Sequence, residues 1–99
     1  MRSDPAEIGE FKITFYSTSG TPRGGFNWID GKTVAMNRDQ MRALGLDFGD
    51  EIYIRSARGW SGYYTVGDTG CAWGTLDIYV APGGIPSWGA ENGAQLLVL

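Results

Sequence analysis

The sequence predicts an all-β fold, a small closed barrel of six strands with one short helix. Two observations carry this prediction. Sixteen Gly and four Pro separate short runs of β-branched and aromatic residues, as is typical of turn-rich all-β domains. The chain has 99 residues, 42% of them hydrophobic, which suits one domain with one core. We expect this domain to span residues 11–99, after a polar lead-in of residues 1–10.

The first two strands are predicted from their residue patterns. Phe11, Ile13 and Phe15 alternate with polar or amphipathic residues, the period-2 pattern of a half-buried strand. Residues 17–32, rich in Ser, Gly and Thr, are expected to form a long loop. Residues 33–36 are a short apolar run, and we expect them to form the second strand.

A short helix is expected directly after this second strand. Asn37 stands in the position of a helix N-cap, and Gln40 follows three residues later, which resembles a capping box. The helix should span residues 38–44 and end at Gly45.

The second half of the chain predicts four further strands. They are residues 50–55, 63–66, 75–80 and 94–99, each rich in β-branched, aromatic or aliphatic residues. Residues 82–93 form a Pro- and Gly-rich connection. Six strands at this spacing suit a small closed barrel.

Charge and composition exclude several function classes. A net charge of −3 argues against binding nucleic acid or an anionic membrane surface, since both require a cationic patch. The apolar runs are far shorter than the roughly 20 residues of a membrane helix, so no membrane insertion is expected. Residues 1–9 lack the apolar core of a signal peptide, and any export signal or anchor is expected outside this sequence.

The side-chain inventory also limits the chemistry. The chain has no His, which excludes Ser-His-Asp and Cys-His catalysis within it and the usual His-bearing zinc sites. Cys71 is the one cysteine, and we interpret it as a small buried hydrophobe rather than a nucleophile. Asp47, Asp50 and Glu51 lack EF-hand spacing. No metal or cofactor is expected, and carboxylates are the leading candidates for proton transfer.

Two carboxylates stand out. Asp68 lies where a strand ends in glycine-rich turn chemistry, and Asp77 lies inside the next strand between Leu76 and Ile78. Strand alternation places Asp77 on the opposite face from these two, together with Tyr79. If that face is a partly desolvated groove, Asp77 can stay protonated as a general acid. The alternative is that Asp68 is a turn residue and Asp77 a solvated surface charge.

The segment containing both aspartates resembles a known family. Residues 66–80, VGDTGCAWGTLDIYV, are similar to the core signature of the three-aspartate, or 3D, domain. Four further parts of the sequence resemble other parts of that family: residues 15–17, residues 33–36, residues 49–54, and residues 88–89 followed by 96–99. The resemblance implies a double-psi β-barrel, the fold of the C-terminal part of membrane-bound lytic transglycosylase A and of stationary-phase survival proteins, which act on peptidoglycan.

The resemblance also implies roles for particular residues. Asp77 matches the third aspartate and would be the catalytic acid/base, while Asp68 matches the second and would orient it or stabilise developing positive charge. Asn37 stands where the first aspartate is expected, with Asp39 two positions on; the alternative for Asn37 is a simple helix cap. The substrate-binding candidates are Asn37, Asp39, Thr69, Gly70, Trp73 and Tyr79.

The tryptophans are candidates for stacking on sugar rings. Trp28, Trp60, Trp73 and Trp88 fall in predicted loops or at strand ends, where an indole can stack on the apolar face of a sugar. Trp73, between the two aspartates, is the best placed of the four. The alternative for each is core packing, and the alternative for Tyr79 is ordinary strand packing.

Three function hypotheses follow. The first is a peptidoglycan-cleaving lytic transglycosylase-type domain that acts on glycan strands as a monomer outside the cell or in the cell envelope. The second is a non-catalytic glycan-binding module, which the Asn37 replacement favours. The third is an assembly domain of a larger envelope or phage particle.

Overall fold

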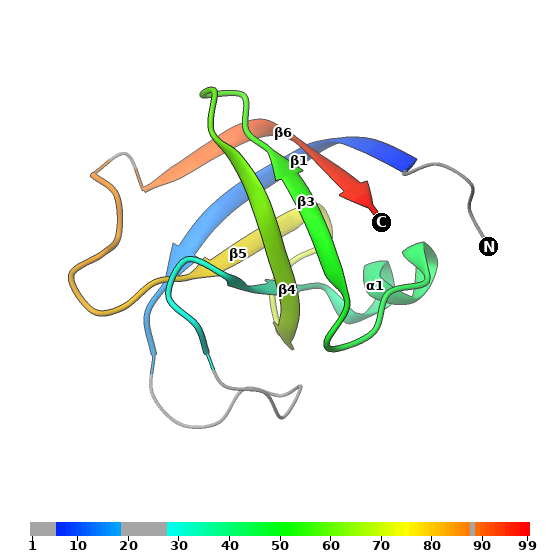
Figure 1. Ribbon diagram of the computed structural model, residues 1–99, viewed down its shortest axis with the longest axis horizontal. Coiled ribbons are helices and arrows are strands. Elements are labelled where there is room, and N and C mark those ends of the chain that lie inside the picture. The colour runs from blue at the N-terminus through cyan, green and yellow to red at the C-terminus, as the bar shows by residue number, and fades with distance from the viewer. Residues whose placement is uncertain (1–5, 19–27, 88) are drawn as a thin grey trace.

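Six β-strands close into a barrel in the computed structural model, which describes residues 6–18, 28–87 and 89–99 (Figure 1). Within these residues β1 pairs parallel with β5 and β2 parallel with β4, and the other four neighbouring pairs are antiparallel. The order around the barrel is β1-β5-β2-β4-β3-β6. The predicted fold class, an all-β six-stranded double-psi barrel with one short helix, is confirmed for this part of the chain. The elements are β1 (Ala6–Tyr16), β2 (Thr33–Met36), α1 (Arg38–Leu44), β3 (Glu51–Arg55), β4 (Ser61–Thr69), β5 (Thr75–Tyr79) and β6 (Ala90–Val98).

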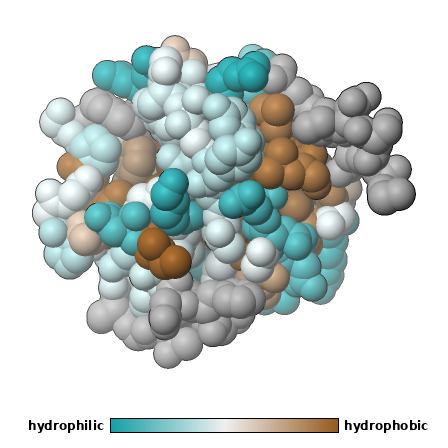
Figure 2. Space-filling model, in the orientation of Figure 1, coloured by the Kyte–Doolittle hydropathy of each residue, from teal (hydrophilic) through white to brown (hydrophobic). Residues whose placement is uncertain are grey.

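Alternating side chains fill the barrel. On β5, Leu76 and Ile78 are buried, whereas Thr75, Asp77 and Tyr79 remain partly exposed, as the alternation predicts. Each fully buried Val, Leu or Ile side chain contributes about 1.5–3 kcal/mol relative to an exposed one. In the view of Figure 2, hydrophilic and weakly polar residues cover most of the described surface, and apolar atoms form separate patches. The buried core consists of Phe11, Ile13, Val34, Met36, Met41, Leu46, Ile52, Ile54, Val66, Leu76, Ile78, Val80, Ala94, Leu96 and Val98.

β1 is longer than the sequence predicts. The expected polar lead-in covers residues 1–10, but β1 begins at Ala6 and its first residues pair with β6. The register shifts between Gly9 and Phe11, and Glu10 between them has φ 91°. This bulge changes the phase of the strand, so the alternation that identifies a strand is visible only after it.

The helix forms where its cap signals place it. The Asn37 side chain accepts a hydrogen bond from the Gln40 backbone N–H at 3.1 Å, and Gly45 ends α1 in the left-handed conformation with φ 72°. Gln40 does not complete a capping box; its side-chain oxygen instead accepts the backbone N–H of Gly74 at 2.7 Å. The helix therefore ties the segment between β4 and β5 to the barrel. Among residues 6–18, 28–87 and 89–99, no helix is long and apolar enough to cross a membrane.

Candidate functional site

Asp68 and Asp77 lie in one row across neighbouring strands. Ala35 on β2 is in register with Asp68 on β4 and with Asp77 on β5, and Asp77 is in register with Thr14 on β1. Residues in register point to the same side of a sheet. The Ala35 side chain points away from the core, because its neighbours on β2 belong to the core. Both carboxylates therefore lie on the outer face of the barrel wall, on either side of a small methyl group.

A bulge at Gly67 turns Asp68 to this outer face. Val66 is fully buried in the core, and strict alternation would place Asp68 in the core as well. The β2–β4 register shifts by one residue here, so that Val34 pairs with Val66 but Ala35 pairs with Asp68. A Cβ on Gly67 would lie 2.9 Å from Cγ2 of Thr33, which explains why glycine occupies the extra position.

Asp68 is a buried acceptor whose hydrogen-bond donors include Thr69, Trp28 and Tyr16. The residue is only 8% exposed to solvent. One oxygen accepts the backbone N–H of Thr69 at 2.9 Å. The other accepts the indole N–H of Trp28 at 3.3 Å and the hydroxyl of Tyr16 at 3.5 Å. Because a buried carboxylate needs such partners, these donors fix its position.

Asp77 carries a carboxyl group whose pKa is raised. It is half-buried, and burial raises the pKa of its carboxyl above the ordinary value, with a further rise from the negative charge of Asp68. The Thr14 hydroxyl donates to its Oδ1 at 2.7 Å and opposes this rise, because it stabilises the ionised form. The net direction is upward, so Asp77 keeps its proton to a higher pH than a solvated aspartate.

Three aromatic rings stand beside Asp68. Trp28 and Tyr79 stack with centroids 5.7 Å apart at 15°, and Tyr16 meets Tyr79 edge to face, also at 5.7 Å. Burial raises the pKa of the Tyr16 hydroxyl, and the charges of Asp68 and Asp77 raise it further. Tyr16 is therefore a neutral donor, and the site combines two carboxylates with a stacked aromatic surface.

The segment between β4 and β5 carries Trp73 in a hydrogen-bonded turn. The Asn37 amide donates to the carbonyl of Cys71 at 3.2 Å, and the Gly74 carbonyl accepts the Lys12 backbone N–H at 2.8 Å. Trp73 is 60% exposed. Its indole is thus available to a ligand on a segment fixed at several points.

Cys71 is a protonated thiol in this structure. It is half-buried, and its Sγ lies 3.4 Å from the Ala35 carbonyl and 3.5 Å from the Thr75 carbonyl. Burial raises the pKa of the thiol to about 11, with smaller contributions from the charges of Asp77 and Asp68. Since the thiolate is the nucleophile, this cysteine is unsuited to covalent catalysis at neutral pH.

The remaining predicted residues divide between this site and its support. Thr69 donates its hydroxyl to the Met36 carbonyl at 2.8 Å, at the end of β4. Gly70 follows with φ 115°. Asn37 uses both ends of its amide within the fold, whereas Asp39 is exposed on α1 and forms an ion pair with Arg42 at 3.9 Å. Trp88 lies outside the described residues.

The sequence reasoning missed Thr14, Tyr16, the role of Trp28 and the Gln40 contact. Thr14 and Tyr16 alternate with core residues of β1, so an outer position was predictable. Their partners were not, because the hydrogen bonds of Thr14 to Asp77 and of Tyr16 to Asp68 join residues 63 and 52 positions apart. Among the described residues, no three Cys, Asp or Glu side chains gather closely enough to hold a metal ion.

Comparison with known proteins gives independent information on the fold. No protein-family model matches this sequence, and no curated protein matches it. Among solved structures, the Streptomyces papain inhibitor is similar, with a TM-score of 0.67 and 17% identity over 98% of each chain. At that identity the similarity shows the fold alone, a small closed β-barrel.

Proposed function

We propose that this domain binds the glycan strands of peptidoglycan along the Asp68–Asp77 row and cleaves them as a lytic transglycosylase. The single observation that supports this most is the environment of Asp77. Its carboxyl is half-buried with a raised pKa, and it shares the outer face with a second, buried carboxylate. A glycosidic acid catalyst must be protonated when it reacts, and burial beside a like charge acts in that direction.

The reaction needs one group that both donates and accepts a proton. The Asp77 carboxylic acid gives its proton to the glycosidic oxygen as the bond from that oxygen to the sugar C1 breaks. The 6-hydroxyl oxygen of the same sugar then bonds to C1, and its proton passes to the Asp77 carboxylate. A 1,6-anhydro ring closes, the acid is restored, and no water is consumed, unlike in two-carboxylate hydrolysis.

Asp68 is a positioning and electrostatic residue in this scheme. Its charge raises the pKa of Asp77, and it would stabilise positive charge that develops on the sugar ring. The 3D-domain resemblance implies that Asp68 would orient Asp77 or stabilise developing positive charge. The proposed substrate contacts are Asn37, Asp39, Thr69, Gly70, Trp73 and Tyr79, to which the geometry adds Trp28. Such a domain would act, as a monomer, where murein is: in the envelope or outside the cell.

Digestion of purified murein tests the proposal directly. The native domain should release anhydro-muropeptides detectable by mass spectrometry, and Asp77→Asn should reduce the rate about 10²–10⁴-fold. The matched control is Glu51→Gln, which alters an exposed carboxylate on β3 and should leave the rate unchanged. No anhydro products from the native domain, or equal release by Asp77→Asn, would reject catalysis.

A glycan-binding module without catalysis is the second candidate. The supporting observation concerns Asn37, which stands in the place of the family's first aspartate. Its amide oxygen accepts the Gln40 backbone N–H, and its amide nitrogen donates to the Cys71 carbonyl. This hypothesis predicts that the native domain sediments with insoluble murein, releases no fragments, and binds less after Trp73→Ala. Undiminished binding by that variant would count against it.

The native domain should also be tested for inhibition of papain, because a similar solved structure is by name a papain inhibitor. We expect no inhibition. Inhibition that Trp73→Ala abolishes would count against both glycan functions.

A further inference from the structure

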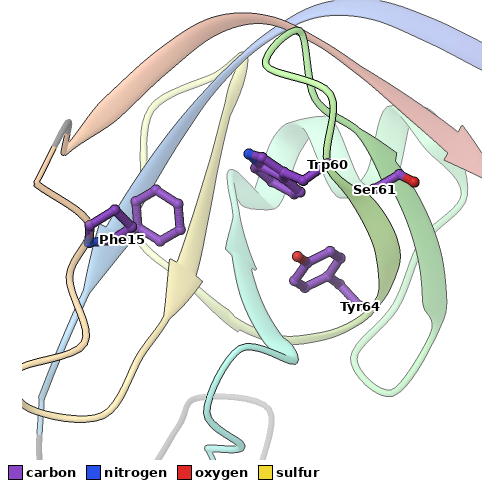
Figure 3. Close-up of a pocket in the computed structure, with 5 residues that line it drawn as sticks. Phe15, Trp60, Ser61 and Tyr64 are labelled. Carbon is purple, nitrogen blue, oxygen red and sulfur yellow. The ribbon is translucent and has the colours of Figure 1, made fainter.

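A second pocket, separate from the Asp68–Asp77 row, lies against the core. Its volume is about 330 Å³, and Phe15, Trp60, Ser61, Tyr64 and Pro86 line it. Phe15 on β1 faces Trp60, which directly precedes β4, and Tyr64 on β4 across this space (Figure 3). This volume is at the lower end of the range for small-molecule sites, so a single small group would fill it.

The lining is aromatic and uncharged. Trp60 and Tyr64 stand at 66° with ring centroids 6.3 Å apart, so their rings form two walls of a corner, and Phe15 forms a third wall. The faces of aromatic rings carry negative electrostatic potential. Burial raises the pKa of the Tyr64 hydroxyl, which keeps this ring neutral.

A buried carboxylate stands behind one of these walls. Glu91 is 7% exposed, and its Oε1 accepts the Trp60 indole N–H at 2.8 Å. Its Oε2 accepts the hydroxyl of Ser56. Both partners are neutral, so neither cancels the charge. An anion hydrogen-bonded to the indole N–H increases the negative potential of the ring, and the burial of Glu91 reduces the screening of its charge by water.

We propose that this pocket binds a quaternary ammonium group, such as the trimethylammonium of a choline-type small molecule. Aromatic walls around a small volume attract a cation through the ring quadrupoles, and Glu91 adds a fixed negative charge. A primary ammonium would need three hydrogen-bond acceptors, whereas the described side chains that line the pocket offer two, the hydroxyls of Ser61 and Tyr64. A trimethylammonium group needs none and presents methyl groups to the rings.

Titration with choline and its neutral analogue 3,3-dimethyl-1-butanol tests the charge requirement, because the two have almost the same shape. We expect choline to shift the Trp60 indole N–H resonance in NMR spectra and to bind at least about fivefold more tightly than the alcohol. Equal affinity for the two, or no response of Trp60 to choline, would overturn the proposal.

Variants then locate the effect. Glu91→Gln keeps an acceptor for Trp60 but removes the charge, and should weaken choline binding about threefold while leaving the alcohol unchanged. If that variant folds poorly, Phe15→Leu keeps an apolar wall without a ring and should weaken choline selectively. Equal losses for choline and the alcohol would reject a cation site. Asp77→Asn should leave choline binding intact, so this site and the glycan proposal fail independently.

Discussion

Two buried carboxylates in this barrel have matching surroundings and opposite placements. Asp68 is 8% and Glu91 7% exposed, and each accepts one indole N–H and one hydroxyl. Each is also placed by a strand irregularity. The bulge at Gly67 turns Asp68 out of the core, whereas the shift from Ala94 to Glu91 against β1 turns Glu91 towards it.

Among the described residues, Asp68 differs from Glu91 in having a second carboxylate in the same row. Asp68 has Asp77 beyond Ala35 in the same row, and its charge helps to raise the pKa of Asp77. Among the described residues, the two oxygens of Glu91 meet only Trp60 and Ser56 as hydrogen-bond partners. An indole–carboxylate hydrogen bond by itself therefore holds a negative charge in a fixed position. At Asp77, burial is the largest cause of the raised pKa, and the charge of Asp68 adds to it.

The largest stability effect is expected at Glu91. Glu91→Ala leaves the Trp60 N–H and the Ser56 hydroxyl without their acceptor, and each unsatisfied buried group costs about 1–3 kcal/mol. We expect a loss of about 2–4 kcal/mol in the free energy of unfolding, measured by urea denaturation. Glu91→Gln, which keeps an acceptor, should lose less than half as much. Equal losses for Ala and Gln would show that volume rather than hydrogen bonding matters at this position.

The bulge that turns Asp68 outward gives the next largest effect. Gly67→Ala places a Cβ 2.9 Å from Cγ2 of Thr33, a buried side chain, and should cost about 1–3 kcal/mol. The matched control is Gly9→Ala, where a Cβ meets no atom within 4 Å. Thr33→Ser removes Cγ2 but keeps the hydroxyl that accepts the Ile29 N–H. A double-mutant cycle should therefore show that Thr33→Ser relieves the clash, and an additive cycle would refute this account of the bulge.

Replacing each indole by a phenyl ring compares the two carboxylates directly. Trp60→Phe removes a 2.8 Å hydrogen bond and Trp28→Phe a 3.3 Å one. Both changes remove similar volume. Trp60→Phe should therefore lower the free energy of unfolding by about 1 kcal/mol more than Trp28→Phe. Murein binding should show the reverse order, with Trp28→Phe the weaker binder. The same order in both assays would contradict the division of roles between the two regions.

The sequence predicts the elements of this barrel better than their ends. The β5 alternation, the Asn37 cap and Gly45 are local signals, and the structure agrees with each of them. β1 and β6 begin four or five residues earlier than expected, because bulges interrupt the alternation there. A strand whose phase changes carries no single period for the sequence to reveal.

The two carboxylates of the candidate site could be predicted from the sequence, but their hydrogen-bond partners could not. Alternation alone places Asp77 on the outer face, as the structure shows. For Asp68 the same rule, applied from Val66, gives the wrong face, because Gly67 adds one residue. The Thr14 and Trp28 hydrogen bonds join residues 63 and 40 positions apart, and only the three-dimensional pairing of the strands brings them together.

The smallest expected effect is a pH-dependent stability difference between the native domain and Asp77→Asn. Burial and the Asp68 charge raise the folded-state pKa of Asp77 above the unfolded value of about 3.9. Its contribution to stability is then fully present below that unfolded value and is lost as pH rises through the folded value. Asp77→Asn lacks this titration and keeps an acceptor for Thr14. The variant should therefore match the native domain at low pH and become the more stable of the two as pH rises.

Denaturation curves of both proteins from about pH 3 to pH 8 measure this difference, because all other titrations are common to them. Thr14→Val removes the hydrogen bond that favours the ionised form, so the pKa of Asp77 should rise further. Since cleavage needs the protonated acid, the alkaline limb of its pH–rate profile should move with that pKa to higher pH. A stability difference that is constant across the range would mean that Asp77 is an ordinary surface carboxylate, and the contrast with Glu91 would lose its chemical meaning.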